Sequence, residues 1–204
     1  DFQNGQLERA NLEGASLHGT SFEKVEGRGA SFLRARGAQT SFAGGKWTDA
    51  VFDETDLPAA DFSAATLDEA SFVQARLAQV RLLDARGKKT RFDGSQMPGA
   101  RAGNAVLTES SLRSVEAPGS VWDKATLEGT SFTGAVLVGA GFSGVKAQGA
   151  DFGGVDATEG RFRKADLRGA RFLSANLMQA TFERADLQGA DLRGANLHEA
   201  ETWK

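Results

Sequence analysis

All fourteen phenylalanines of this chain occupy positions whose numbers end in 2, from Phe2 to Phe182. Positions ending in 2 or 7 are mostly Phe or Leu, and the residue two places before each is mostly Ala, Val, Thr, Ser or Gly. The repeating unit is therefore five residues long. An α-helix requires apolar residues at a spacing of about 3.6 and a half-buried strand requires a spacing of about 2, so a period of five matches neither.

The charged residues test the same frame independently of the phenylalanines. None of the 27 acidic and 24 basic residues falls at a position ending in 0, 2, 5 or 7. Because an unpaired ion in a buried slot costs several kcal/mol, two positions in every five face inward. This pattern predicts a solenoid in which each repeat forms one short side and a turn forms each corner.

The clearest stretch reads A-[D/N]-[L/F]-x-x and is ADLQGADLRGANL, from Ala185 to Leu197. It resembles the pentapeptide repeat family, and the resemblance covers essentially the whole chain. The resemblance implies an all-β fold, a right-handed quadrilateral parallel β-helix with four repeats in each coil. Residues 1–204 would then form a single domain without insertion loops, in which residues twenty apart stack. At about 4.8 Å between neighbouring strands, about ten coils would make a rod roughly 48 Å long.

Two tryptophans occupy central positions of this frame. Trp47 follows Gly27 by one coil, and Trp122 follows Ala102 by one coil. Because protein cores conserve packed volume, each indole ring is predicted to fill the space beside its smaller neighbour. Chance placement remains an alternative, since other central positions hold small residues without a tryptophan nearby: Gly37, Gly87, Ala117, Ala147 and Ala157.

Catalytic motifs are not recognisable in this pattern. The chain has no cysteine, hence no disulfide or thiolate chemistry. His18 and His198 fall on one corner but nine coils apart, too far to share a metal. The glycine-rich stretch GAGFSGVKAQGADFGG lacks the lysine and the helix that a phosphate-binding loop requires. We expect no enzyme, no catalytic residue, no cofactor and no metal.

The ends of the chain lead to two further expectations. The longest apolar run, around Gly134 to Gly141, is too short to cross a bilayer, and neither an initiator methionine nor a signal peptide is present. We expect a segment of a larger bacterial protein, cytoplasmic unless a leader is missing, with no membrane contact. Because exposed edges of a β-helix recruit other chains and only HEAETWK follows Leu197, we expect either end-to-end homodimers or caps in the parent protein.

Basic residues gather at the middle of the chain. Four arginines precede the central residue on four successive sides, and Lys88, Lys89 and a fifth arginine lie nearby. We call the five arginines the basic girdle: Arg76, Arg81, Arg86, Arg91 and Arg101. Residues 47–75 before it contain seven acids and no base. Two interpretations remain open, salt bridges between adjacent coils or a docking site for an acidic partner.

One outward column of the twenty-residue coil carries no Asp, Glu, Lys or Arg. It contains ten residues: His18, Ala38, Pro58, Ala78, Pro98, Pro118, Val138, Thr158, Met178 and His198. Depletion of charge together with exposed apolar side chains is typical of an interface core. The candidate interface residues are Pro58, Ala78, Pro98, Pro118, Val138 and Met178. The alternative is that this corner favours proline only for its turn geometry.

The charge on each side of the coil helps to choose between two functions. Face one comprises outward positions 1, 3 and 4 of each coil, and face four comprises positions 16, 18 and 19. The net charges of faces one to four are +2, −1, −1 and −3, which sum to the −3 of the chain. We expect a non-enzymatic scaffold or protein-interaction module with an unidentified protein partner and no direct nucleic-acid binding.

The family resemblance implies an alternative function. Quinolone-resistance members of the family act as DNA mimics that bind DNA gyrase and other type II topoisomerases, through a markedly acidic face. No face of this chain is strongly acidic, and no loop interrupts its repeats.

Overall fold

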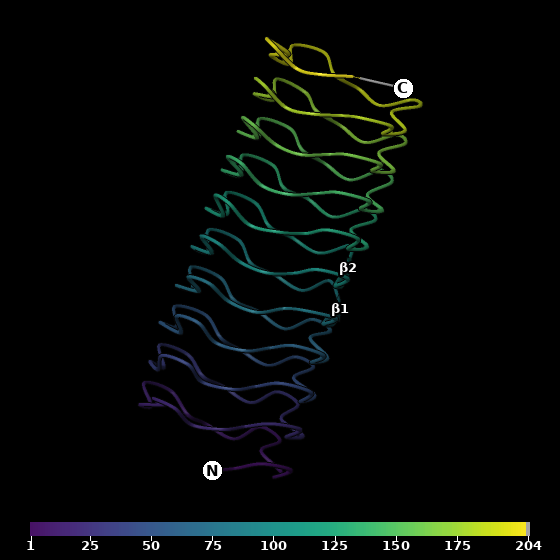
Figure 1. The fold of residues 1–204 in the computed structure, drawn as a ribbon. Helices are drawn as coiled ribbons and strands as arrows, with labels where there is room; N and C mark the ends of the chain where they lie inside the picture. The colour runs from purple at the N-terminus through teal and green to yellow at the C-terminus, as the bar shows by residue number, and fades with distance from the viewer. Residues whose placement is uncertain (203–204) are drawn as a thin grey trace.

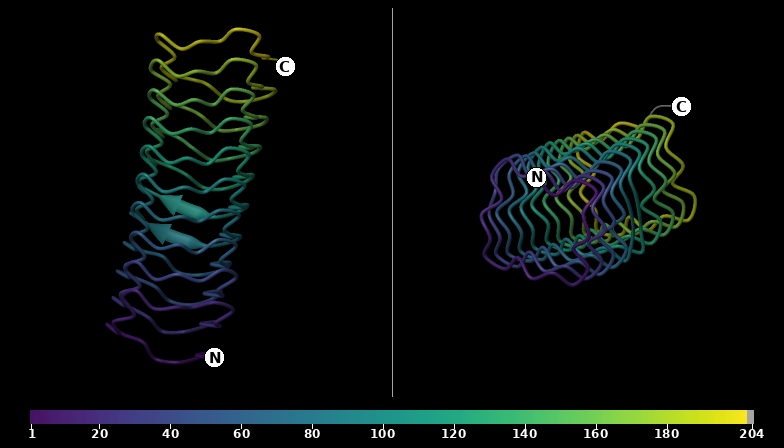
Figure 2. Two further views of the ribbon diagram at one scale, coloured as in Figure 1. Left: turned by 90° about the vertical axis from the view of Figure 1, so that its left-hand side faces the viewer. Right: turned by 90° about the horizontal axis from the view of Figure 1, so that it is seen from below.

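The computed structural model describes residues 1–202, which wind in stacked coils from one end of the molecule to the other (Figure 1). Parallel bridges join residues twenty apart at four places in each coil, beginning with Gln6 and Glu26 and ending with Thr181 and Glu201. Each coil therefore has twenty residues and four sides, as the family resemblance implies. Residues 1 and 202 lie at opposite ends of the stack, and no insertion interrupts the five-residue pattern between them (Figure 2).

The coils are held together mainly by short backbone hydrogen-bonded contacts rather than by long β-strands. Residues 1–202 contain only two strands, β1 (Arg86–Lys88) and β2 (Val106–Thr108), which pair in parallel. A typical repeat is bonded to the next coil at two points: the N–H of Phe32 donates to Val51 O at 2.7 Å, and the N–H of Arg34 donates to Asp53 O at 3.0 Å. Because each side turns after five residues, the pairing cannot extend further along the chain.

Each side ends in a four-residue turn of constant geometry. Every position ending in 4 or 9 from Asn4 to Glu199 has a positive φ, between 53° and 73°, and 24 of these residues are not glycine. The turn around Arg34 is closed by the N–H of Ala35, which donates to Phe32 O at 2.8 Å. Positive φ at the third residue is the mark of a type II turn, which accepts proline at its second residue. The backbone register therefore imposes a conformation that L-residues otherwise avoid at a cost of about 1–3 kcal/mol each.

The core is built from two columns of phenylalanine on opposite sides of the coil. Rings twenty residues apart stack: the centroids of Phe32 and Phe52 are 4.8 Å apart, with an interplanar angle of 4°. Rings ten residues apart meet edge to face, as Phe32 and Phe42 do at 5.3 Å and 88°. The buried polar residues of residues 1–202 are threonines and serines, and none of their acids or bases is buried. The predicted division into inward and outward positions is confirmed.

The tryptophan expectation is confirmed at Trp47. A Cβ atom added to Gly27 would lie 2.1 Å from Cζ3 of Trp47, so the indole ring occupies the space that a side chain would need. The indole N–H donates to Phe42 O at 3.1 Å, which satisfies its buried donor. Trp122 is also buried and donates to Ser120 Oγ at 2.8 Å, whereas its packing on Ala102 stays a prediction.

Candidate interaction surface

The charge-poor column of face four lies along one edge of the stack. Pro98 and Pro118 are exposed, and the other four candidate interface residues are half-buried. Backbone hydrogen bonds join successive coils along this column. The N–H of Gly99, which follows Pro98, donates to Pro118 O at 3.0 Å, and the N–H of Gly119, which follows Pro118, donates to Val138 O at 2.8 Å. All four sides share the same positive-φ turn, so turn geometry alone does not explain why the prolines are confined to this side.

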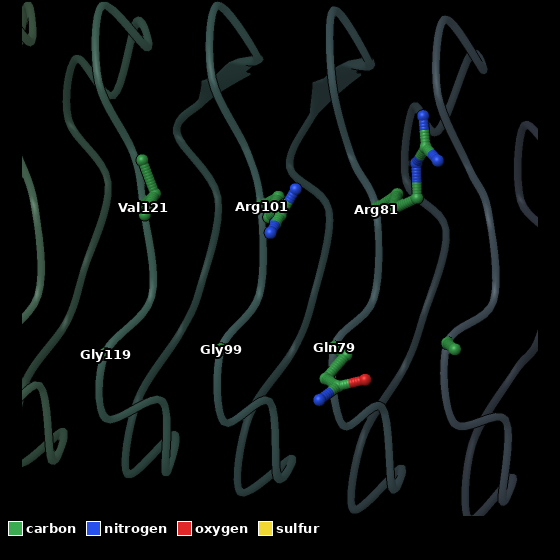
Figure 3. A pocket seen from close by; sticks show the side chains of 7 residues that line it. Gln79, Arg81, Gly99, Arg101, Gly119 and Val121 are labelled. Atoms are coloured by element: carbon green, nitrogen blue, oxygen red, sulfur yellow. The ribbon is translucent and has the colours of Figure 1, made fainter.

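A groove of about 490 Å³ follows the corner between face four and face one. We call it the first groove. Figure 3 shows its lining in two parallel rows, one of Gln79, Gly99 and Gly119 and the other of Arg81, Arg101 and Val121. Ala59 also contributes to the lining. The corner is hollow there because two successive members of the first row are glycines, and a Cβ on Gly119 would meet nothing within 4 Å.

A second groove, of about 430 Å³, lies at the opposite corner of face four. Its lining is charged and comprises Arg34, Arg36, Glu54, Asp56, Gln74 and Arg76. Part of this charge is neutralised internally, since Nε of Arg34 lies 3.1 Å from Oε2 of Glu54. Face four is therefore bordered by a hollow on both sides at Pro58 and Ala78, whereas at Pro98 and Pro118 only the first groove borders it. We call the charge-poor column the ridge.

The basic girdle is only partly neutralised by neighbouring coils. Nε of Arg81 lies 3.5 Å from Oδ2 of Asp61, and Nε of Arg91 lies 3.8 Å from Oδ2 of Asp93. No ion pair within residues 1–202 involves Arg76, Arg86 or Arg101. A salt bridge between adjacent coils thus accounts for one of the five arginines, Arg81, and a contact within one repeat accounts for Arg91. The remaining three keep their donors available to solvent or to a partner.

Perturbed acids lie elsewhere, in the C-terminal coils. The guanidinium of Arg168 donates to both carboxylate oxygens of Asp166, at 2.8 and 2.7 Å, and lowers the pKa of that carboxyl. Arg193 lowers the pKa of Asp191 in the same way. Both pairs join neighbours two residues apart on the surface, so they fix local side-chain positions and define no recess.

Metal-binding clusters and membrane-spanning helices are absent from the part of the chain that the structure describes. Residues 1–202 contain no group of three or more metal-ligating side chains and no helix long and apolar enough to span a bilayer. His198 approaches Glu199 at 3.4 Å, and His18 lies on the same column at the other end of the stack.

Comparison with known proteins identifies the family of this chain. The family model for pentapeptide repeats matches in eight copies, over residues 1–36, 38–73, 48–84, 137–172 and 175–201. These ranges cover more than half of the sequence, and the chain therefore belongs to the pentapeptide repeat family. Residues 85–136, which contain β1, β2 and most of the first groove, lie outside the matched ranges.

Two solved structures align with nearly the whole chain. HetL, from the cyanobacterium Nostoc sp. strain PCC 7120, is a pentapeptide repeat protein involved in heterocyst differentiation regulation. It is 26% identical, with a TM-score of 0.65, and the match covers 96% of this chain and 89% of HetL. A trypsin-treated form of QnrB1, a plasmid-mediated fluoroquinolone resistance protein, is 14% identical over 92% of this chain and 89% of its own, with a TM-score of 0.46. No curated protein matches the chain.

The sequence located the ridge and the girdle but missed both grooves. A signal for the first groove was present in the column that follows the charge-poor one. That column carries Gln39, Ala59 and Gln79 and then changes to glycine at Gly99, Gly119 and Gly139, of which the first two directly follow prolines. Loss of successive side chains at a corner predicts a hollow, provided that residues twenty apart are known to stack.

Proposed function

We propose that this chain is a non-enzymatic scaffold that binds a protein partner through face four. The observation that carries the proposal is the uncharged ridge of Pro58, Ala78, Pro98, Pro118 and Val138, which the first groove borders from Pro58 to Pro118 and the second groove borders at Pro58 and Ala78. Interface cores are depleted of charge and are formed by apolar side chains, whereas their rims are polar. Arg36 and Arg76 on one flank and Arg81 and Arg101 on the other supply such a rim.

Two further considerations support binding over catalysis. An enzyme site needs convergent polar groups in a recess that excludes water, whereas both grooves are open channels whose side chains stand in rows. HetL, at 26% identity, is described as involved in regulation, a role that a binding scaffold can perform. We extend that kind of role to this chain as part of the proposal.

The DNA-mimic alternative receives no specific support from the surface. Duplex DNA carries one negative charge per about 1.7 Å, so a mimic requires a densely acidic face. Face four has the most negative net charge of the four sides, yet it carries only five acids against two arginines, Arg36 and Arg76. The acids are Asp56, Glu116, Asp156, Glu159 and Glu199. The girdle also adds three arginines without an ion pair in residues 1–202, Arg76, Arg86 and Arg101, on three of the four sides.

A matched pair of double variants tests the proposed function. Ala78→Lys with Val138→Lys places two charges on the ridge, and Ala43→Lys with Val73→Lys places the same charges on other sides. All four residues are half-buried and occupy the second position of their turns, so the two variants are chemically equivalent. The tagged wild-type chain and both variants would be incubated with lysate of the source organism, and the bound proteins identified by mass spectrometry.

The proposal expects a partner that is retained by the wild type and by the control variant. The same partner should be lost with Ala78→Lys and Val138→Lys, and its loss should be confirmed with purified proteins. Melting temperatures within a few degrees of wild type would show that all three chains are folded. Identical sets of bound proteins for all three would contradict the assignment of face four.

A further inference from the structure

We infer that the first groove binds an extended acidic peptide segment of the partner, an inference that rests on the proposed function and names the chemistry of its ligand. The groove is lined by Arg81 and Arg101 on one wall and by Gly99 and Gly119 on the other. Its length sets how many residues of an extended segment it can hold, and its charge selects their side chains.

The length of the groove accommodates a short extended chain. From Ala59 to Gly119 the groove crosses three coil steps, about 14 Å at a strand spacing of about 4.8 Å. An extended segment of about four residues, at about 3.3 Å per residue, spans that length.

The charge of the groove requires carboxylates from the occupant. Arg101 is exposed and has no ion-pair partner within residues 1–202, and no acidic residue lines the groove. Arg81 contacts Asp61 at 3.5 Å, but its side chain remains 54% exposed, so that pair is weak. Guanidinium groups bind carboxylates bidentately, and two of them on adjacent coils form a row that an acidic segment can follow.

The opposite wall accounts for the remaining side chains of the segment. Successive side chains of an extended chain point to opposite sides, so residues that alternate with the carboxylates point toward face four. There Gly99 and Gly119 leave the backbone open, and Pro98 and Pro118 stand exposed behind them. A segment in which acidic and apolar residues alternate therefore matches both walls.

A nucleic-acid strand fits the same groove less well. The arginine row ends after two residues, because Asp61 precedes Arg81 and the uncharged Val121 and Gly141 follow Arg101 in the same column. A phosphate backbone carries a charge at every nucleotide and gains affinity with each one neutralised. Two arginines beside an aspartate can neutralise few phosphates and so add little affinity for a nucleic-acid strand. The same two arginines are enough to pair with two carboxylates of a peptide.

The probe for the test is a fluorescein-labelled hexapeptide of alternating Glu and Val, with a hexapeptide of alternating Gln and Val as its neutral counterpart. Fluorescence polarisation with the full chain should show at least tenfold tighter binding of the Glu peptide. Arg101→Gln should weaken that binding about tenfold. Gly119→Gln should abolish it, because the glutamine fills the groove in the positive-φ conformation that Gln79 adopts in the same row.

Two control variants match these changes outside the groove. Arg161→Gln removes an exposed arginine from the same column as Arg101, three coils further on. Gly149→Gln adds the same side chain at a glycine of positive φ with open space around it, on another corner. Both controls should bind the Glu peptide as the wild type does, and thermal melting should show all four variants folded.

Several results would overturn the inference. Equal affinity for the Glu and Gln peptides, or affinity within twofold of wild type in Arg101→Gln and Gly119→Gln, would show that the groove does not select carboxylates. Tighter binding of a single-stranded oligothymidine, lost in the same two variants, would assign the groove to nucleic acid instead. If the captured partner were lost with Ala78→Lys and Val138→Lys but kept with Arg101→Gln, the proposed function would stand and the groove assignment would fail.

Discussion

Removing one phenylalanine from a column tests how much the ring geometry adds to the stability of this core. Phe52 and Phe92 belong to the same column and are both fully buried. Phe52 stacks on two rings, each with centroids 4.8 Å away, and meets three more edge to face: Phe32, Phe72, Phe42, Phe62 and Trp47. Phe92 stacks on Phe72 at 4.7 Å. Truncation to alanine therefore removes similar buried area but different ring contacts.

The expected difference follows from these contacts. A buried Phe→Ala change costs about 3–5 kcal/mol through lost transfer free energy and the cavity that remains. Each aromatic pair adds about 0.5–1.5 kcal/mol beyond area burial, although such terms are not additive among rings in mutual contact. We expect Phe92→Ala near the lower end of the range, about 3 kcal/mol, and Phe52→Ala at least about 1 kcal/mol above it.

Urea denaturation followed by tryptophan fluorescence measures both variants. Trp47 contacts Phe52 and reports on its coils, and far-UV circular dichroism gives an independent probe of the whole stack. Coincident transitions and equal m-values are needed before the midpoints are converted to free energies, because a linear repeat can lose cooperativity. Equal destabilisation by the two variants would refute the reasoning, since burial alone would then explain the core.

Three further predictions concern charge, target and assembly. Phe132→Asp places an unpaired charge against Phe152 and Trp122 and should abolish the cooperative melting transition, whereas an unchanged melting curve would show that the slot is not buried. In a gyrase supercoiling assay the chain should neither inhibit nor protect at micromolar concentration, and an effect at that level would revive the DNA-mimic alternative. Phe2 and Leu197 are exposed in the end coils, so light scattering of the isolated chain should show end-to-end dimers that form as concentration rises. A clean monomer across a hundredfold range of concentration would argue against that association.

The sequence predicted the fold well because one rule governs inward and outward positions. The fourteen phenylalanines and the distribution of charge suffice to identify buried slots, and the family resemblance supplies the four sides. The type II turns were less visible, since 24 non-glycine residues adopt positive φ with no shared side-chain chemistry. Residues as different as Arg34, Ala59 and Glu69 share that conformation because hydrogen bonds to the next coil impose it.

The candidate site was harder to foresee, because it depends on neighbours that are twenty residues apart. Arg76 and Asp56 occupy adjacent coils at bridged positions, which favours a salt bridge from sequence alone, yet no ion pair joins them. Arg81 and Asp61 stand in the same relation and are paired at 3.5 Å. Long side chains on adjacent coils can point along the corner or across it, and the sequence does not determine that choice.

Residues 85–136, which the family model does not match, combine fewer stacked aromatic rings in the core with several residues of the proposed binding surface. The aromatic columns are interrupted there, since Leu82 and Ala102 separate Phe62 from Trp122 in one column and Leu112 follows Phe92 in the other. A thinner core gives less ring stacking, and the two strands β1 and β2 extend the backbone pairing at that level. The exposed prolines and Arg101 lie in the same segment. A segment that keeps the coil geometry through backbone pairing is free to vary its side chains, and this freedom is what a binding surface on a repeat scaffold requires.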